Sequence, residues 1–273
     1  LMRDDLFTVV HERFMTDTAR YADIVLPATS SLEHSDLYRA YGTYFIQRTK
    51  PVIEPVGNSR SNLEVFSMLA EKLGFDEPFF RKSADELIDR LLELPSPLRD
   101  GIDNAGLQKG RAVRLNVSSD LKRFGTPSGK IEILNRSEKE LLPRYLPTHE
   151  ENGTLPLRLM TAPSVHALNA SFYERDDLRK KQQCMFLMMN PEDGAKRGLT
   201  DGDTAVAWNT LGEVTFILKI SDATPEGVVV AEGVWWLEFA PGKRSVNALV
   251  SQRLTDQASG STFYDNRVDV RKA

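Results

Sequence analysis

One stretch, LPLRLMTAPSVHALNAS, which runs from Leu155 to Ser171, decides how the rest of the chain is interpreted. Its first half places Leu155, Leu157 and Leu159 at every second position, the pattern of a strand with one buried face. Its second half consists of small and polar residues, which let a ligand approach the backbone and supply hydrogen-bond donors and acceptors. A strand that runs into such a loop is a common place for a binding site, although ordinary surface turns share this composition.

Short strand patterns come after this stretch, separated by turn residues. A compact helix lies among them, with Asn190 at its N-cap, Pro191 first inside and Gly198 beyond its end. Short strands at this spacing predict a small, mostly antiparallel barrel. The predicted strands are 184–189, 204–208, 214–220, 228–231 and a last one near 268–270.

The chain before the stretch has a different pattern. A predicted core strand at 6–10, a short helix capped within Thr16, Asp17 and Thr18, and a second buried strand at 23–27 form an α/β unit. The N-terminus of that helix either holds an anion or serves only as a helix start. Residues 33–58 are irregular and mix aromatic side chains with arginines. Such side chains either stack on a flat ring or, more commonly, pack on an edge strand.

Two capping boxes, Ser61 to Glu64 and Ser83 to Glu86, predict helices whose apolar stripes cover a sheet. Further strands are predicted at 112–117 and 131–134. Proline and glycine then gather over 142–156, which predicts a domain boundary between residues 150 and 151.

Composition and charge exclude several classes of protein. The chain has 273 residues, of which 41% are hydrophobic and 27% charged, with a formal net charge of −4. These are ordinary globular values, and the charge argues against non-specific binding to nucleic acid or a membrane surface. No apolar run is long enough to cross a bilayer. Because the chain starts at Leu1 and enters a strand almost at once, we expect a fragment.

The sequence offers no candidate nucleophile or metal centre. The single cysteine, Cys184, is predicted to be a buried strand thiol. Met15 breaks an HExxH zinc motif after His11, and Gly125 to Lys130 lacks the spacing of a phosphate-binding Walker loop. A hydrolase is disfavoured because there is no GxSxG motif.

Taken in order, several motifs resemble the C-terminal part of the molybdopterin oxidoreductases of the dimethyl sulfoxide reductase family. That family includes formate dehydrogenases, nitrate reductases, and thiosulfate and polysulfide reductases. The motifs are Phe14 to Pro27 with Glu33 after it, Thr126 to Glu132, the Thr161–Ser171 loop, Asn190 to Asp193, Gly198 to Asp203, Asn247 to Leu249, and Ser259-Gly260.

The resemblance implies an α/β fold followed by a mainly β fold. Residues 1–150 would be the rear of a Rossmann-like domain, and residues 151–273 a double-psi β-barrel that binds a molybdopterin dinucleotide. Asp265 departs from relatives that carry a basic residue there, and residues 42–48 also depart from the family pattern. By position, the implied cofactor contacts are Thr161, Ala162, Pro163, His166, Asn169, Ser171, Asn247, Phe263 and Tyr264, with Thr16 and Thr18 from the first domain.

The resemblance also places the metal ligand, and any iron–sulfur cysteines, upstream of Leu1. The whole enzyme would hold molybdenum or tungsten on molybdopterin guanine dinucleotide and carry out two-electron redox chemistry, while this chain alone would be inactive. Its partners would be the N-terminal portion of the same protein and an iron–sulfur electron-transfer subunit, with no nucleic acid and no membrane insertion. A prokaryotic cytoplasmic location is favoured over a periplasmic one. The alternative is a stand-alone barrel subunit without enzymatic activity that binds a cofactor or protein partners.

Overall fold

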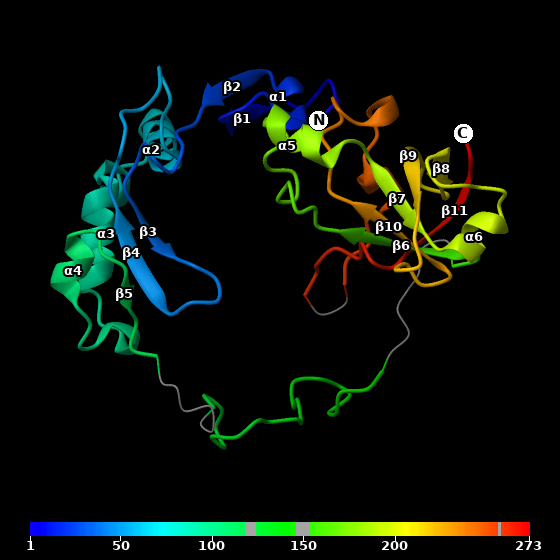
Figure 1. Ribbon diagram of the computed structural model, residues 1–273. Coiled ribbons are helices and arrows are strands. Elements are labelled where there is room, and N and C mark those ends of the chain that lie inside the picture. The colour runs from blue at the N-terminus through cyan, green and yellow to red at the C-terminus, as the bar shows by residue number, and fades with distance from the viewer. Residues whose placement is uncertain (118–123, 146–152, 256–257) are drawn as a thin grey trace. The chain divides into compact units, whose positions relative to one another are not determined.

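The computed structural model describes residues 1–117, 124–145, 153–255 and 258–273 (Figure 1). The chain forms two compact units, Leu1–Arg144 and Tyr145–Ala273. The boundary predicted between residues 150 and 151 lies outside the described residues. In the part of the chain that the structure describes, no helix combines the length and apolar character needed to cross a bilayer.

The second unit is built on a closed barrel of six strands (Figure 1). Around the barrel the order is β10-β6-β11-β8-β9-β7, in which β6·β10 and β7·β9 are parallel and the other four pairs are antiparallel. The predicted small, mostly antiparallel barrel is therefore confirmed. The strands are β6 (Leu157–Ala162), β7 (Phe186–Met189), β8 (Thr204–Trp208), β9 (Glu213–Ile220), β10 (Val228–Glu232) and β11 (Asn266–Lys272).

The barrel core reproduces the alternation in the sequence. Leu157 and Leu159 of β6 are fully buried, as their period-2 spacing predicts, while Arg158 between them is half-buried. Val214, Phe216 and Leu218 of β9 likewise share one buried face. These side chains form a single apolar cluster inside the barrel, so burial of one face of each strand stabilises its closure.

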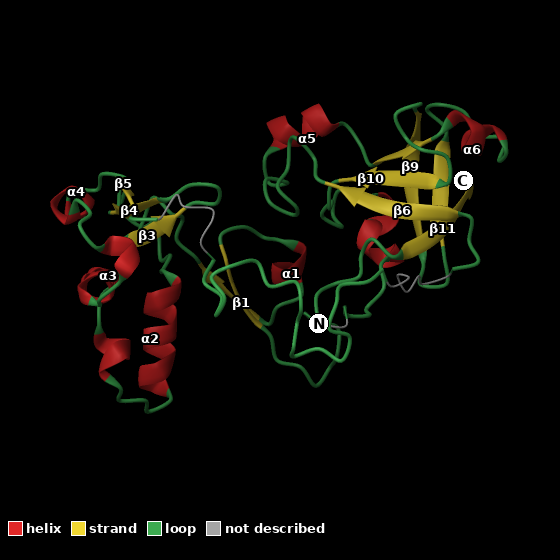
Figure 2. Cartoon of the chain, turned by 90° about the horizontal axis from the view of Figure 1, so that it is seen from below, coloured by secondary structure: helices red, strands yellow, loops and turns green. Residues whose placement is uncertain are grey.

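Short helices connect the strands (Figure 2). The predicted cap is confirmed, because the Asn190 side chain accepts a hydrogen bond from the Glu192 backbone N–H at the start of α6. Cys184 lies before β7 and is only half-buried, which corrects its assignment as a buried strand thiol. Burial still raises its pKa. The connecting helices are α5 (Asp176–Gln182), α6 (Pro191–Ala195), η3 (Pro241–Lys243) and η4 (Val246–Leu249).

The first unit opens with a parallel pair, β1 (Val9–Glu12) and β2 (Ile24–Pro27), joined through α1 (Asp17–Arg20). Thr16 caps α1 by accepting from the Ala19 N–H, as predicted. The strands are not buried as predicted, because Val9 is 50% and Ile24 is 44% exposed. The reason is that this sheet has two strands, so apolar side chains on its faces have little to pack against.

Residues 33–58, predicted as irregular, contribute two strands of an antiparallel sheet. Its order is β3 (Asp36–Arg39), β4 (Phe45–Thr49) and β5 (Val113–Arg114), so the strand predicted at 112–117 is shorter than expected. No strand forms at 131–134, where Ile131 is 68% exposed, because a β-prone segment needs a partner strand.

The helices of this unit are α2 (Asn62–Lys72), α3 (Ala84–Glu93) and α4 (Asn104–Gln108), with the 3₁₀ turns η1 (Pro78–Arg81) and η2 (Pro97–Arg99). Both predicted capping boxes are present, from Ser61 and from Ser83. The predicted cover of a sheet holds for α3, which contacts β3 and packs its Leu92 against Ile46 and Val113 of the same sheet. The predicted apolar stripe of α2 is instead largely exposed. Phe66 is 63% exposed, and the buried positions are Ala70 and Ile88. Helical spacing defines an apolar face but not the element that covers it.

Candidate ligand-binding site

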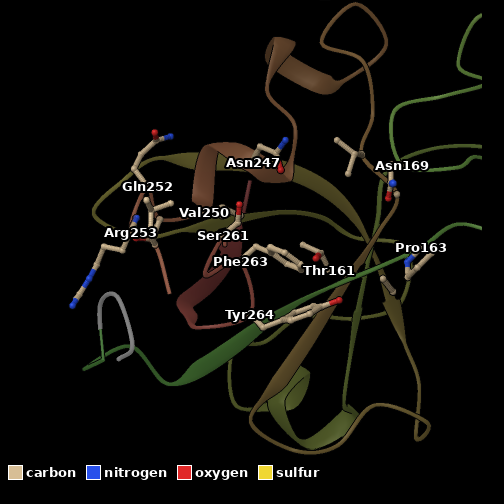
Figure 3. Close-up of a pocket in the computed structure, with 15 residues that line it drawn as sticks. Thr161, Pro163, Asn169, Asn247, Val250, Gln252, Arg253, Ser261, Phe263 and Tyr264 are labelled. Carbon is tan, nitrogen blue, oxygen red and sulfur yellow. Dashed lines mark hydrogen bonds between the residues drawn. The ribbon is translucent and has the colours of Figure 1, made fainter. Parts of the chain in front are cut away.

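A cavity of about 540 Å³ opens on the barrel unit (Figure 3). Residues from three separate parts of the sequence line it: the end of β6 and its loop, the turn after β10, and the stretch from η4 to the start of β11. The lining residues are Thr161, Ala162, Pro163, Asn169, Gly233, Val234, Asn247, Val250, Ser251, Gln252, Arg253, Leu254, Ser261, Phe263 and Tyr264.

The parallel pairing of β6 with β10 brings the first two parts together. Thr161 and Ala162 lie opposite Ala231 and Glu232, so both strands end at the same edge of the barrel. The Gly233 N–H continues the pairing by donating to the Ala162 carbonyl oxygen at 2.9 Å. This register places the turn after β10 beside the end of β6.

Gly233 fits its position because a side chain would not. Its φ of +79° is one that glycine adopts readily, and an added Cβ would lie 2.6 Å from both the Tyr173 hydroxyl and the Gln182 amide nitrogen. Those two groups are joined by a hydrogen bond of 3.2 Å. Burial raises the pKa of Tyr173, which keeps its phenol neutral and able to pair with the Gln182 amide.

The loop after β6 is anchored near its C-terminal end. Trp236 donates from its indole Nε1 to the Ala170 carbonyl oxygen at 2.7 Å, and Ser171 closes the loop by donating to the Leu168 carbonyl at 2.8 Å. Between them Asn169 takes a positive φ of 52° and lines the cavity. Thr161 and Ala162 belong to β6, so the loop begins at Pro163 and not at Thr161 as predicted.

Phe263 and Tyr264 form an aromatic wall just before β11. Their ring centroids lie 4.3 Å apart at 57°, and Figure 3 shows both rings beside Thr161. The two side chains are only partly exposed, at 38% and 45%. Rings presented in this way can pack against a flat heterocycle.

The electrostatics of the cavity are nearly neutral. Among the described lining residues, Arg253 is cationic and none is acidic. Figure 3 shows the Arg253 side chain directed away from Thr161 and Tyr264, so its charge lies away from that part of the cavity. The arrangement can hydrogen-bond the polar edges of a ring and tolerates negative charge, because no carboxylate opposes it.

The structure brings most of the predicted site residues together. Seven line the cavity, and their role in binding a cofactor stays a prediction. His166 and Ser171 lie in the same loop but do not line it, and the His166 N–H donates to the Ser164 hydroxyl at 3.1 Å. Thr16 and Thr18 lie in the first unit. The seven are Thr161, Ala162, Pro163, Asn169, Asn247, Phe263 and Tyr264.

Three parts of the lining were not predicted from the sequence: the turn after β10, the segment 250–254 and Ser261. The glycine at the end of the Val228–Glu232 strand was a usable signal, since it marks a turn beside a strand that pairs with the site strand. Segment 250–254 carries no comparable signal. Over the described ranges, no group of three or more His, Cys, Asp and Glu side chains is placed to hold a metal ion.

Comparison with known proteins gives this fold and cavity a family. The family model described as molydopterin dinucleotide binding domain matches residues 157–267, which include every residue lining the cavity. The model described as molybdopterin oxidoreductase matches residues 1–72.

Individual relatives agree with the family models. The chain is 38% identical over 279 residues to the probable oxidoreductase YoaE of Bacillus subtilis, an alignment that covers 100% of this chain and 41% of that protein. It is 28% identical over 272 residues to a dimethyl sulfoxide/trimethylamine N-oxide reductase of Rhodobacter capsulatus, covering 84% of this chain and 32% of that protein. Acetylene hydratase from Pelobacter acetylenicus has a similar fold, with a TM-score of 0.77 at 22% identity, covering 98% of this chain and 40% of that one.

The closed barrel and its cavity thus lie within the region that the dinucleotide-binding family model matches, and the whole chain shares its fold with the acetylene hydratase. The chain belongs to the molybdopterin oxidoreductases of the dimethyl sulfoxide reductase family and matches the C-terminal part of those relatives. It spans about two fifths or less of the length of the relatives named above.

Proposed function

We propose that this chain is the cofactor-binding portion of a molybdenum or tungsten oxidoreductase that uses molybdopterin guanine dinucleotide. The observation that carries the proposal is the cavity at the parallel ends of β6 and β10, which lies wholly within the region matched as dinucleotide binding. In this proposal the barrel is of the double-psi type, and the first unit is the rear of a Rossmann-like domain.

The residues of the cavity fit such a cofactor. A pterin dinucleotide combines flat heterocycles, which have polar edges, with phosphates. Phe263 and Tyr264 offer ring faces, Thr161, Asn169 and Asn247 offer hydroxyl and amide groups, and among the described lining residues no carboxylate would repel a phosphate.

Each part of the chain has a defined task in this proposal. When bound, the metal cofactor supplies two-electron redox chemistry. Asn169 and Asn247 bind the polar groups of the cofactor, and the aromatic wall orients its rings. The barrel edge where β6 and β10 end excludes water from one side of the cofactor. No residue of this chain is assigned to the reacting atoms.

The relatives indicate which substrates to test first. The R. capsulatus protein is described as a dimethyl sulfoxide/trimethylamine N-oxide reductase, so sulfoxides and N-oxides come before formate, nitrate and thiosulfate. We further propose an iron–sulfur subunit as electron partner and a prokaryotic cytoplasmic location. A stand-alone barrel subunit is the second candidate, since the cavity is formed entirely by the second unit.

The test is the intact mass, metal content and pterin content of the native protein isolated from its source. A chain much heavier than 30.7 kDa that carries molybdenum or tungsten together with a pterin supports the proposal. A metal-free chain of 30.7 kDa supports the stand-alone subunit.

A variant pair locates the cofactor in that protein. Asn247→Ala removes an exposed amide from the cavity wall, and we expect it to lower pterin content. Asn58→Ala removes an amide that is also exposed, from a turn of the first unit, and should leave pterin content unchanged. Equal pterin content in the two variants would show that the cavity does not bind the cofactor.

A further inference from the structure

Two asparagines of the barrel unit are buried but do not line the cavity. Asn209 is 7% exposed and Asn266 is 0% exposed. Burying a carboxamide costs free energy unless its donors and acceptors are paired. Both side chains are paired with backbone groups, and those groups include Leu249, Ser251 and Thr262 of the segment that walls the cavity. Asn209 also accepts at its Oδ1 from the N–H groups of Leu211 and Gly212.

Asn266 joins the two ends of that segment. Its Oδ1 accepts from the backbone N–H of Ser251 at 2.8 Å, and its Nδ2 donates to the carbonyl oxygen of Thr262 at 3.2 Å. Ser251 lines the cavity, and Thr262 directly precedes the aromatic wall. One buried side chain therefore fixes both the entry and the exit of the segment.

Further hydrogen bonds close the segment on itself above Asn266. The Thr262 hydroxyl donates to the Arg253 carbonyl oxygen at 3.0 Å. Nearer the tip, Thr255 donates its N–H to the Gly260 carbonyl at 2.8 Å, and Gly260 donates back to the Thr255 hydroxyl at 2.9 Å. The described part of the segment is thus a loop closed by internal hydrogen bonds, and the Asn266 carboxamide anchors both of its ends.

Asn209 is a second anchor at the N-terminal end of the wall. Its Nδ2 donates to the Leu249 carbonyl oxygen at 2.9 Å, at the end of the turn η4 that carries Asn247. The same nitrogen donates to the Arg267 carbonyl of β11 at 3.2 Å. The turn that contains Gly212 packs directly against η4. A Cβ added to Gly212 would lie 3.0 Å from the Ala248 carbonyl oxygen.

The strand register connects these anchors to the opposite side of the cavity. Asn266 pairs with Leu159 of β6, two residues before Thr161. The position of Asn266 is therefore set by the same strand that delivers Thr161 to the cavity. The two sides of the cavity are therefore positioned relative to each other by the pairing of β6 with β11.

We propose that Asn209 and Asn266 are positioning residues, which hold the described wall residues, 247–255 and 258–264, in the geometry that the cofactor requires. The inference rests on the proposed function of the cavity. If the two side chains contributed only to overall stability, any barrel asparagine with equivalent bonds would serve equally.

Asn190 provides that comparison. Its Nδ2 donates to the Thr224 carbonyl oxygen at 2.8 Å, and its Oδ1 accepts from the Glu192 N–H at 2.9 Å. It thus makes the same two kinds of bond as Asn266, away from the lining residues. Leucine replaces asparagine at similar volume and removes both bonds.

The experiment compares Asn209→Leu, Asn266→Leu and Asn190→Leu in the full-length protein. It measures the moles of pterin retained per mole of protein after gel filtration and the midpoint of thermal unfolding. All three variants should lower the midpoint. Only Asn209→Leu and Asn266→Leu should retain less pterin than the wild type, by about tenfold. This factor is the lower end of the loss expected when a group that orients a binding residue is removed. Asn266→Asp, which keeps the acceptor for the Ser251 N–H, should retain more pterin than Asn266→Leu.

Hydrogen exchange of the backbone amides over 251–255 and 258–264 supplies a readout without cofactor. It should accelerate in Asn266→Leu and stay unchanged in Asn190→Leu. Equal exchange in these two variants, or equal loss of pterin from them, would overturn the positioning role. A wild-type protein that holds no pterin would instead refute the proposed function, and the exchange comparison would still decide whether Asn266 positions the wall.

Discussion

The indole Nε1 of Trp236 donates a hydrogen bond of 2.7 Å to the carbonyl oxygen of Ala170. The two residues are far apart in the sequence, and the bond ties the turn after β10 to the loop after β6. Trp236 also stacks on Phe239, with ring centroids 6.1 Å apart at 16°. A directed hydrogen bond therefore ties the loop that presents Asn169 to a rigid, buried ring.

We expect Trp236→Phe to remove this donor while keeping most of the ring packing. Loss of the bond should lower the free energy of unfolding by about 1 kcal/mol and speed proteolysis within residues 163–171. Trp235→Phe is the control, because the buried Trp235 Nε1 has no hydrogen-bond partner among the described residues. If both variants are cut in that loop at the same rate, the bond does not hold it.

Gly233→Ala should destabilise the barrel more than Gly227→Ala. Both glycines have a φ of +79°, but a Cβ at Gly233 meets two side-chain atoms at 2.6 Å and one at Gly227 meets nothing within 4 Å. Backbone strain alone costs about 1 kcal/mol, and overpacking adds about 1–3 kcal/mol at Gly233. Chemical denaturation of the two variants measures the difference, and equal losses would show that Tyr173 and Gln182 move aside freely.

Glu33 should make the first unit sensitive to acid. Its carboxylate accepts from the Ser30 N–H at 2.5 Å and the Val56 N–H at 2.7 Å. A hydrogen bond with the Ser30 side chain, followed by these two backbone bonds, lowers its pKa from 4.5 to about 2. Because the folded-state pKa is depressed, the stabilisation is fully present above pH 4.5 and is lost as the pH falls through about 2.

The corresponding variant is Glu33→Gln. It should be less stable than the wild type near neutrality, and the difference should shrink as the pH falls below 4.5. Urea unfolding across that pH range measures it. Glu54→Gln, at an exposed position, is the control and should show no such convergence. A constant difference between Glu33→Gln and the wild type would contradict the linkage.

Arg48 should be the most costly charge to remove from the first unit. Its side chain is 5% exposed, and it bridges β4 to α3 through ion pairs of 2.5 Å with Asp85 and Asp89. The hydrogen bond from Arg48 is the leading cause that lowers the pKa of both carboxyl groups.

Arg48→Met should lower the free energy of unfolding by about 2 kcal/mol, less than for a fully buried pair, because the two orphaned carboxylates reach water. Arg111→Met is the control, since Arg111 pairs with Asp103 at the surface, where both side chains are more than half exposed. Surface pairs contribute about 0–1 kcal/mol. Similar losses in the two variants would show that burial of Arg48 adds nothing.

Local sequence signals predicted the elements that depend on local physics. The capping boxes from Ser61 and Ser83 and the Asn190 cap formed as expected, because each satisfies backbone groups within three residues of itself. The alternation of Leu157 and Leu159 placed both in the core, since side-chain direction along a strand is fixed.

Burial was predicted poorly wherever it depended on distant partners. The apolar residues around Val9 and Ile24 are partly exposed, and Ile131 lies outside any strand. In the same way, nothing local to Arg48 indicated that it would be buried between two aspartates of a later helix. A strand or an ion pair needs its second member, which the pattern around the first does not specify.

By itself, the sequence determined the β6 strand, the polar loop after it and the order of motifs that identifies the family, because these lie in contiguous residues. Only the tertiary structure decided that the turn at Gly233 and the segment from Asn247 to Tyr264 meet that loop around one cavity. The physical reason is barrel closure. The parallel register of β6 with β10 and the buried carboxamides of Asn209 and Asn266 join segments that no local pattern relates.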